Sequence, residues 1–211
     1  MHRTAITLIC NRATPLLDDE FSARFSAYLN QMDLGTVAPV MLAEGVAFDF
    51  LCTGQMPEAE LKSAVASFIG DAPIDAVIQS AEGRRKKLLI ADMDSTIIEQ
   101  ECIDELAEYA GKRAEISAIT ERAMRGELDF EGALTERVAM LKGLPESVLA
   151  ETFEKRITLT PGALELVKTM NAQGAMTALV SGGFTYFTGR VSKKVGFQDN
   201  RRIFCWWRMA C

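Results

Sequence analysis

Two short apolar segments, far apart along the sequence, constrain the fold of this 211-residue chain. Residues 87–91 (KLLIA) and 176–180 (MTALV) are the apolar runs. Runs of this length are typical of strands buried on both faces of a parallel sheet. A crossover between parallel strands needs about a dozen residues or a few more, yet 84 separate Ala91 from Met176. We therefore predict an insertion between two strands of one sheet.

The inserted segment has the pattern of helices. Apolar residues keep helical spacing over 103–107 and again over 134–141, with breaks near Gly111, Gly126 and Gly143. We predict a small helical cap at about residues 99–157. It would lie over the carboxyl ends of the strands, where open α/β folds bind their ligands.

The first 80 residues have a different pattern. Strands are predicted at 3–10, 36–42, 46–52 and 75–79, and helices at 18–32 and 58–68. This β-α-β-β-α-β order predicts a ferredoxin-like α+β domain over residues 1–80. The polar segment 81–86 (AEGRRK) is favoured as a solvated linker over an anion-binding patch. A second, α/β domain follows over residues 87–200.

Composition removes several classes of partner and mechanism. The net charge of −6 argues against nucleic acid as a partner. His2 is the only histidine, which excludes a Ser-His-Asp triad and a histidine-ligated metal. The five cysteines form no C-x-x-C pair, which favours reduced thiols in a cytoplasmic protein. Apolar runs all fall short of the roughly 18 residues of a membrane span, so we expect no membrane association.

Two carboxylates follow the first apolar strand directly. Asp92 and Asp94 (DMDST, 92–96) are two residues apart, so in an extended segment both side chains point the same way. Two such carboxylates repel each other unless a cation is present, and Mg²⁺ is the hard cation that oxygen ligands suit. On spacing alone, an acidic turn with Asp94 as a helix N-cap is equally open.

A second polar cluster ends the other apolar strand. Ser181, Gly182 and Gly183 place a hydroxyl and two accessible backbone amides at the expected start of a helix. Such a position suits phosphate oxygens. A plain turn is the alternative, but two polar clusters at strand ends of one sheet favour a functional site.

Together these segments carry a family resemblance. DMDST, followed by EQECIDELAEYAG, MRGELDFEGALTERVAMLKGLP and VSGGF, resembles the haloacid dehalogenase-type phosphatases, and among them the phosphoserine phosphatases. The resemblance covers residues 87–200 and implies a Rossmann-like parallel sheet with an inserted helical cap. The first 80 residues resemble the ACT-like domain found on bacterial members.

The resemblance implies a reaction and residues that perform it. Asp92 would attack phosphorus to form an aspartyl-phosphate, and Asp94 would protonate the leaving oxygen and later activate water. Asp92 and Asp94 would also hold Mg²⁺, while Ser181 and Gly182 would bind phosphate oxygens. The implied substrate is O-phospho-L-serine, in L-serine biosynthesis.

The cap would recognise the amino-acid part of this substrate. The resemblance implies that Glu101 binds the ammonium, that Arg137 binds the carboxylate, and that Met124 and Phe130 wall the pocket. Without the surrounding motifs, Glu101 and Arg137 would be read as surface charges, and Met124 and Phe130 as core residues.

The chain also departs from the family pattern. The family's later lysine and G-D-G-x-N-D segment do not occur among these 211 residues, and residues 201–211 (RRIFCWWRMAC) show no helix or strand pattern. We expect a C-terminal truncation or a frame shift near residue 200. The consequences would be an incomplete sheet with exposed apolar surface, and impaired activity.

Two other functions stay open. One is a catalytically inactive binding or regulatory protein whose N-terminal domain senses an amino acid. The other is a phosphatase of the same superfamily that acts on another small phosphorylated metabolite. The N-terminal domain could equally serve the packing of a homodimer.

Overall fold

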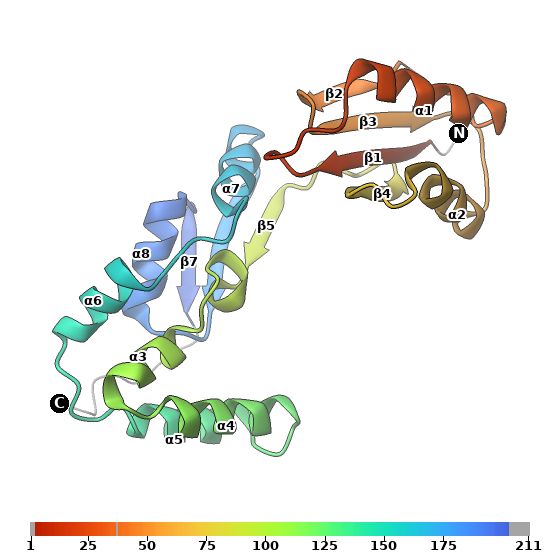
Figure 1. Cartoon of the computed structure of the whole chain (residues 1–211). Coiled ribbons are helices and arrows are strands. Elements are labelled where there is room, and N and C mark those ends of the chain that lie inside the picture. The colour runs from red at the N-terminus through yellow and green to blue at the C-terminus, as the bar shows by residue number, and fades with distance from the viewer. Residues whose placement is uncertain (1–2, 37, 203–211) are drawn as a thin grey trace. The chain divides into compact units, whose positions relative to one another are not determined.

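The computed structural model describes residues 3–36 and 38–202, and the chain divides into two compact units, residues 1–85 and 86–211 (Figure 1). The elements of the first unit are β1 (Thr4–Cys10), α1 (Asp19–Gln31), β2 (Val40–Ala43), β3 (Ala47–Cys52), α2 (Glu58–Ile69) and β4 (Ile74–Ser80). They form an antiparallel sheet in the order β2-β3-β1-β4. The β-α-β-β-α-β order is the predicted one. β2 begins only after Pro39, because proline cannot donate to a sheet ladder.

One face of this sheet packs on the two helices. Ile6, Leu8 and Phe50 on the strands are buried against Phe25 of α1 and Leu61 of α2. The rings of Phe25 and Phe50 meet edge to face, with centroids 4.8 Å apart. This apolar layer is the core of the first unit.

A charged residue from the predicted linker binds to the other face. Both terminal nitrogens of Arg84 donate to the Asp49 carboxylate, at 2.6 and 2.8 Å, and Thr7 Oγ1 donates to it at 2.6 Å. Thr7 and Asp49 are cross-strand partners on β1 and β3. Arg84 is therefore a structural residue of the first unit rather than a solvated linker charge.

We expect Arg84→Met to destabilise the first unit. Burial favours a raised pKa for Asp49, but the hydrogen bonds from Arg84 and Thr7 and the Arg84 charge outweigh it and lower the pKa below the usual 3.8. The variant leaves a buried carboxylate without its cation, which costs about 2 kcal/mol of unfolding free energy at pH 7. A lowered pKa contributes stability above pH 3.8 that is lost as the pH falls further. The difference in unfolding free energy between wild type and Arg84→Met should therefore be smaller in acid.

Urea unfolding followed by circular dichroism at pH 7 and at pH 3 measures this effect. The control is Arg85→Met, because Arg85 is exposed beside Arg84. Equal stability of the two variants at pH 7 would show that the ion pair between Arg84 and Asp49 contributes nothing to the unfolding free energy.

The second unit is a parallel sheet with helices. Its elements are β5 (Leu88–Ala91), the helical turn η1 (Met93–Ile97), α3 (Cys102–Ala110), α4 (Arg113–Met124), α5 (Phe130–Ala139), α6 (Ser147–Lys155), α7 (Ala163–Ala172), β6 (Met176–Ser181), α8 (Thr185–Val195) and β7 (Asp199–Arg202). The strands pair in the order β5-β6-β7, and all are parallel. The predicted α/β class, with a helical segment inserted between two strands, is confirmed.

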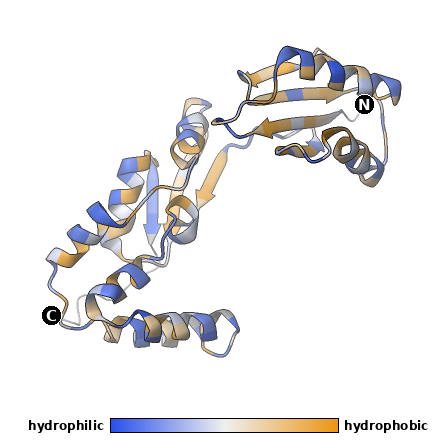
Figure 2. Ribbon diagram, in the orientation of Figure 1, coloured by the Kyte–Doolittle hydropathy of each residue, from blue (hydrophilic) through white to orange (hydrophobic). Residues whose placement is uncertain are grey.

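The third strand corrects one expectation. Arg201 and Arg202 were assigned to a tail without regular structure, but they end β7, where they pair with Val180 and Ser181 of β6. The segment DNRR is entirely polar, as the blue arrow of β7 in Figure 2 shows, so its sequence carries no strand pattern. Backbone pairing with β6 forms the strand instead. The remainder of the predicted tail, residues 203–211, lies outside the described residues.

The inserted helices are joined to the sheet by two chain segments that run side by side. Ile98 forms a β-bridge with Leu159, and backbone hydrogen bonds from Glu99 N to Thr158 O and from Thr160 N to Ile97 O flank it. Helices α3 to α6 lie between these two segments in the sequence. No helix in the described part of the chain is long and apolar enough to span a bilayer.

One face of the parallel sheet is covered and the other exposes apolar side chains. Ala91 and Leu179 pack in one cluster with Val167 of α7 and Val191 of α8. On the opposite face Leu88, Ile90 and Met176 are 52, 61 and 51% exposed. Among the strands of the second unit, β5 is the orange arrow in Figure 2. Parallel strands are normally buried on both faces.

We expect this exposed face to make the purified chain self-associate. Replacing Leu88 and Ile90 together by lysine should convert associated protein into a smaller species, because the charges prevent burial of the face between molecules. Sedimentation velocity over a range of concentrations measures the change. The control is Leu166→Lys on α7, since Leu166 is also exposed. A wild-type chain that sediments as a monomer at high concentration would contradict the prediction.

Candidate active site

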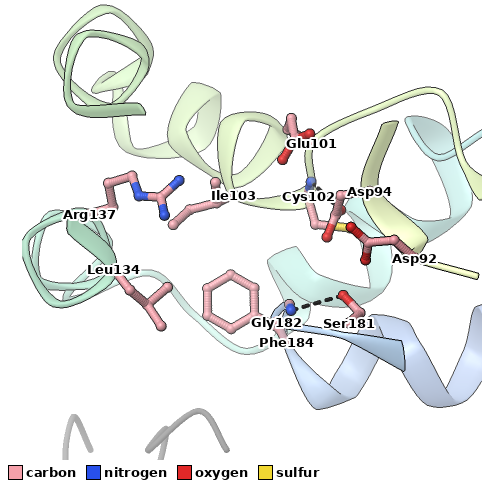
Figure 3. A pocket seen from close by; sticks show the side chains of 11 residues that line it. Asp92, Asp94, Glu101, Cys102, Ile103, Leu134, Arg137, Ser181, Gly182 and Phe184 are labelled. Atoms are coloured by element: carbon pink, nitrogen blue, oxygen red, sulfur yellow. Dashed lines mark hydrogen bonds between the residues drawn. The ribbon is translucent and has the colours of Figure 1, made fainter. Parts of the chain in front are cut away.

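A pocket of about 180 Å³ lies where the carboxyl ends of β5 and β6 meet α3 and α5 (Figure 3). Its lining residues are Asp92, Asp94, Glu101, Cys102, Ile103, Leu134, Arg137, Ser181, Gly182, Gly183 and Phe184. The volume is below the roughly 300–1,000 Å³ of pockets for drug-sized ligands. The pocket therefore suits a small metabolite.

The two carboxylates predicted to share a site do share it. Asp92 follows β5 and caps η1 by accepting a hydrogen bond from its neighbour Met93 N at 2.7 Å. Asp92 and Asp94 both have extended backbone, with ψ angles of 164° and 137°. Their side chains consequently point into the same pocket, and Asp92 is exposed to an incoming ligand.

Asp94 has an environment that favours its protonated form. Burial raises the pKa of its carboxyl, hydrogen bonds from Cys102 lower it, and the charges of Glu101 and Asp92 raise it further; the net shift is upward. One of these bonds is from Cys102 N to Asp94 Oδ1, at 2.9 Å. Asp94 thus satisfies a free N–H in the first turn of α3. A carboxyl held in this way can give up a proton to a leaving group.

The turn after β6 brings a hydroxyl and glycines against the carboxylates. Ser181 is buried, and its Oγ accepts a hydrogen bond from Gly183 N at 2.9 Å. A Cβ on Gly183 would lie 2.8 Å from Asp94 Oδ2 and 3.1 Å from Ser181 Oγ. Only glycine fits here, because any side chain would displace the Asp94 carboxylate.

Glu101 reaches the pocket from the first turn of the inserted helices. Its Oε1 accepts a hydrogen bond from Ser95 Oγ at 2.6 Å. Ser95 is in the left-handed region, with φ of 50°, although it is not glycine. Such a backbone is uncommon and persists where surrounding contacts hold it. Here Ser95 N donates to Gln100 O at 3.1 Å, which brings η1 back toward Glu101.

The far side of the pocket comes from α5. Arg137 and Leu134 lie on this helix, facing the strand ends across the pocket (Figure 3). Met124 ends α4 and Phe130 begins α5, but the side chains of these two residues are not among those that the structure describes. The structure thus brings together Asp92, Asp94, Glu101, Arg137, Ser181 and Gly182 of the eight residues predicted for the site.

Several residues that shape the pocket have no clear signal in the sequence. Gly183 was noted only as a backbone amide, whereas its contact with Asp94 requires the two strand ends to be adjacent. Cys102 is a buried core residue, but its backbone N–H also holds Asp94. Ser95 carries no sequence feature that would indicate a left-handed backbone.

Three thiols are buried and free in the described residues, at Cys10, Cys52 and Cys102. Burial raises the pKa of the Cys102 thiol far above its usual value. A neutral thiol is a poor nucleophile, so Asp92 and Asp94 are the better candidates for chemistry in this pocket.

Comparison with known proteins agrees with this arrangement. Residues 89–202 match the family of haloacid dehalogenase-like hydrolases. A phosphoserine phosphatase of Archaeoglobus fulgidus is 47% identical over 156 residues, which are 72% of this chain and 45% of the relative. The chain spans about half the length of the curated relatives it matches.

Two solved structures are also similar. A haloacid dehalogenase family hydrolase from Salmonella enterica serovar Typhi superposes with a TM-score of 0.70 at 29% identity, over 95% of this chain and 67% of that one. A phospho-aspartyl intermediate analogue of phosphoserine phosphatase has a TM-score of 0.52 at 41% identity, over 56% of each chain. With its parallel sheet, its inserted helices and the carboxylate pair after the first strand of that sheet, the chain belongs to the haloacid dehalogenase-like hydrolases.

Proposed function

We propose that this protein is a phosphomonoesterase that hydrolyses O-phospho-L-serine to L-serine and phosphate, as a cytoplasmic step of L-serine biosynthesis. The observation that carries the proposal is one pocket lined both by carboxylates, a hydroxyl and glycine backbone at strand ends and by an acid and an arginine from the inserted helices. The names of its relatives support the choice of substrate.

The reaction divides into two transfers of one phosphoryl group. An oxygen of Asp92 attacks phosphorus in line, the bond from phosphorus to the serine oxygen breaks, and Asp94 gives its proton to that oxygen. Water then attacks the aspartyl-phosphate, Asp94 takes a proton from the water, and phosphate leaves with Asp92 restored. Asp94 suits both roles because burial raises its pKa.

Positioning of the phosphate falls to the turn after β6. Ser181 Oγ and the Gly182 backbone lie at the pocket end of β6, just before α8. Phosphoryl transfer depends mostly on positioning and charge stabilisation, and a hydroxyl with backbone amides near a helix N-terminus provides both.

The amino-acid part of the substrate has two charged groups, and the pocket has one partner for each. Glu101 can pair with the ammonium, and Arg137 can grip the carboxylate through two parallel N–H donors. Phe184, Ile103 and Leu134 supply an apolar wall beside them. Met124 and Phe130 remain proposed wall residues from the family resemblance.

The residues present fit a Mg²⁺ ion. In the described part of the chain no three His, Cys, Asp or Glu side chains are grouped to hold a metal by themselves. Mg²⁺, however, is usually held by one or two carboxylates together with waters and substrate phosphate. The Asp92 carboxylate and the Asp94 backbone carbonyl would hold it. When bound, it would offset the repulsion between Asp92 and the phosphate.

Phosphate release from O-phospho-L-serine by the full chain, with Mg²⁺ and with EDTA, tests the proposal. Metal-dependent release is the expected result, at a rate reduced if the family's lysine and G-D-G-x-N-D segment are needed. Release from other small phosphate esters but not from phosphoserine would favour a different substrate. Serine binding without any release would favour the inactive binding protein.

A further inference from the structure

Arg137 is oriented by contacts within the inserted helices. Its Nε donates to Ala133 O at 3.2 Å, and its Nη1 donates to Thr120 Oγ1 at 3.2 Å. A guanidinium has five N–H donors, so these two bonds fix its plane and leave other donors for a ligand. The orientation is therefore set before any ligand arrives.

Thr120, on α4, can only accept from Arg137. Its single hydroxyl proton is directed to Ile116 O, at 3.1 Å. A hydroxyl has one donor and two lone pairs, so this bond turns the lone pairs toward the guanidinium. The hydroxyl is thus a specific acceptor, which a methyl group of the same shape would not replace.

We propose that Thr120 is a positioning residue that holds Arg137 in the orientation for a substrate carboxylate. Thr120 does not line the pocket, so it acts through Arg137. The inference rests on the proposed function, because it assigns Arg137 to the carboxylate of the substrate. It predicts that the Thr120 hydroxyl determines preference for phosphate esters that carry a carboxylate.

Calorimetric binding to the full chain carrying Asp92→Asn tests this without turnover. The two ligands are O-phospho-L-serine and O-phosphoethanolamine, which has the phosphate and ammonium but no carboxylate. We expect Thr120→Val to weaken phosphoserine binding about tenfold and to leave phosphoethanolamine binding unchanged. Thr120→Ser keeps the hydroxyl and should restore the parent affinity. Thr120→Ala also removes the hydroxyl that accepts from Arg137; it should weaken phosphoserine binding to a similar extent, and it serves as the second variant if Thr120→Val does not fold.

The matched control is Thr135→Val, because Thr135 is exposed on α5 two residues from Arg137. An equal effect of Thr120→Val and Thr120→Ala on both ligands, or no effect of either variant, overturns the inference. So does a parent chain that binds neither ligand or does not discriminate between them. If the Asp92→Asn chain discriminates between the two ligands but the wild-type chain releases no phosphate, the proposed activity is refuted and the positioning role is intact.

Discussion

Asp92→Asn is expected to abolish phosphate release from O-phospho-L-serine. The amide oxygen is a far weaker nucleophile than the carboxylate, so no aspartyl-phosphate forms. Loss of a nucleophile costs about 10³-fold in rate or more, which corresponds to about 4 kcal/mol of transition-state stabilisation. Asp92 is exposed in the pocket, and its side chain accepts a hydrogen bond from its neighbour Met93 N, so the variant should keep its fold.

Two measurements check this expectation. Steady-state phosphate release gives the rate, and mass spectrometry of acid-quenched wild-type protein should find one phosphoryl group on the peptide that contains Asp92. The control is Asp71→Asn, an exposed residue in a turn of the first unit. Undiminished release by Asp92→Asn would refute the nucleophile assignment. If the wild-type chain gives the phosphorylated peptide but releases no phosphate, the step that fails is the hydrolysis of the aspartyl-phosphate.

Gly183→Ala is expected to have the second largest effect. The added Cβ would lie 2.8 Å from Asp94 Oδ2 and 3.0 Å from Met93 Cε, so the Asp94 carboxylate must move. A displacement of about 1 Å in a catalytic group can cost about 10²-fold in rate. Because the backbone at Gly183 has no positive φ, the loss should come from this contact and not from strain in the turn.

The matched control is Gly189→Ala in the middle of α8. A Cβ there meets nothing within 4 Å, and alanine stabilises a helix by about 1 kcal/mol relative to glycine. Rates of phosphate release and melting temperatures of both variants measure the two effects separately. Full activity in Gly183→Ala would contradict the expected displacement of Asp94 by the added Cβ.

The sequence by itself determined the parts of the fold that depend on local pattern. The apolar runs at 87–91 and 176–180 form β5 (Leu88–Ala91) and β6 (Met176–Ser181), and the long separation between them holds helices α3 to α7. The alternation over 46–52 likewise predicts β3. These features are readable because burial of one face or both imposes a period on the chain.

The sequence also indicated which polar residues would meet. Asp92 and Ser181 each stand at the carboxyl end of an apolar strand, and neighbouring parallel strands place such ends at one edge. Glu101 and Arg137 were assigned to the site only by family resemblance, since single charges on helices carry no spatial information.

Only the tertiary structure decided the contacts that join distant segments. β7 has a polar sequence and exists because β6 offers it a partner. Arg84 pairs with Asp49, 35 residues away, and Gly183 packs against Asp94. Thr120 meets Arg137 from another helix. No sequence pattern indicates these contacts. Each one forms between segments that only the folded chain brings together, so it depends on the free energy of that particular pair.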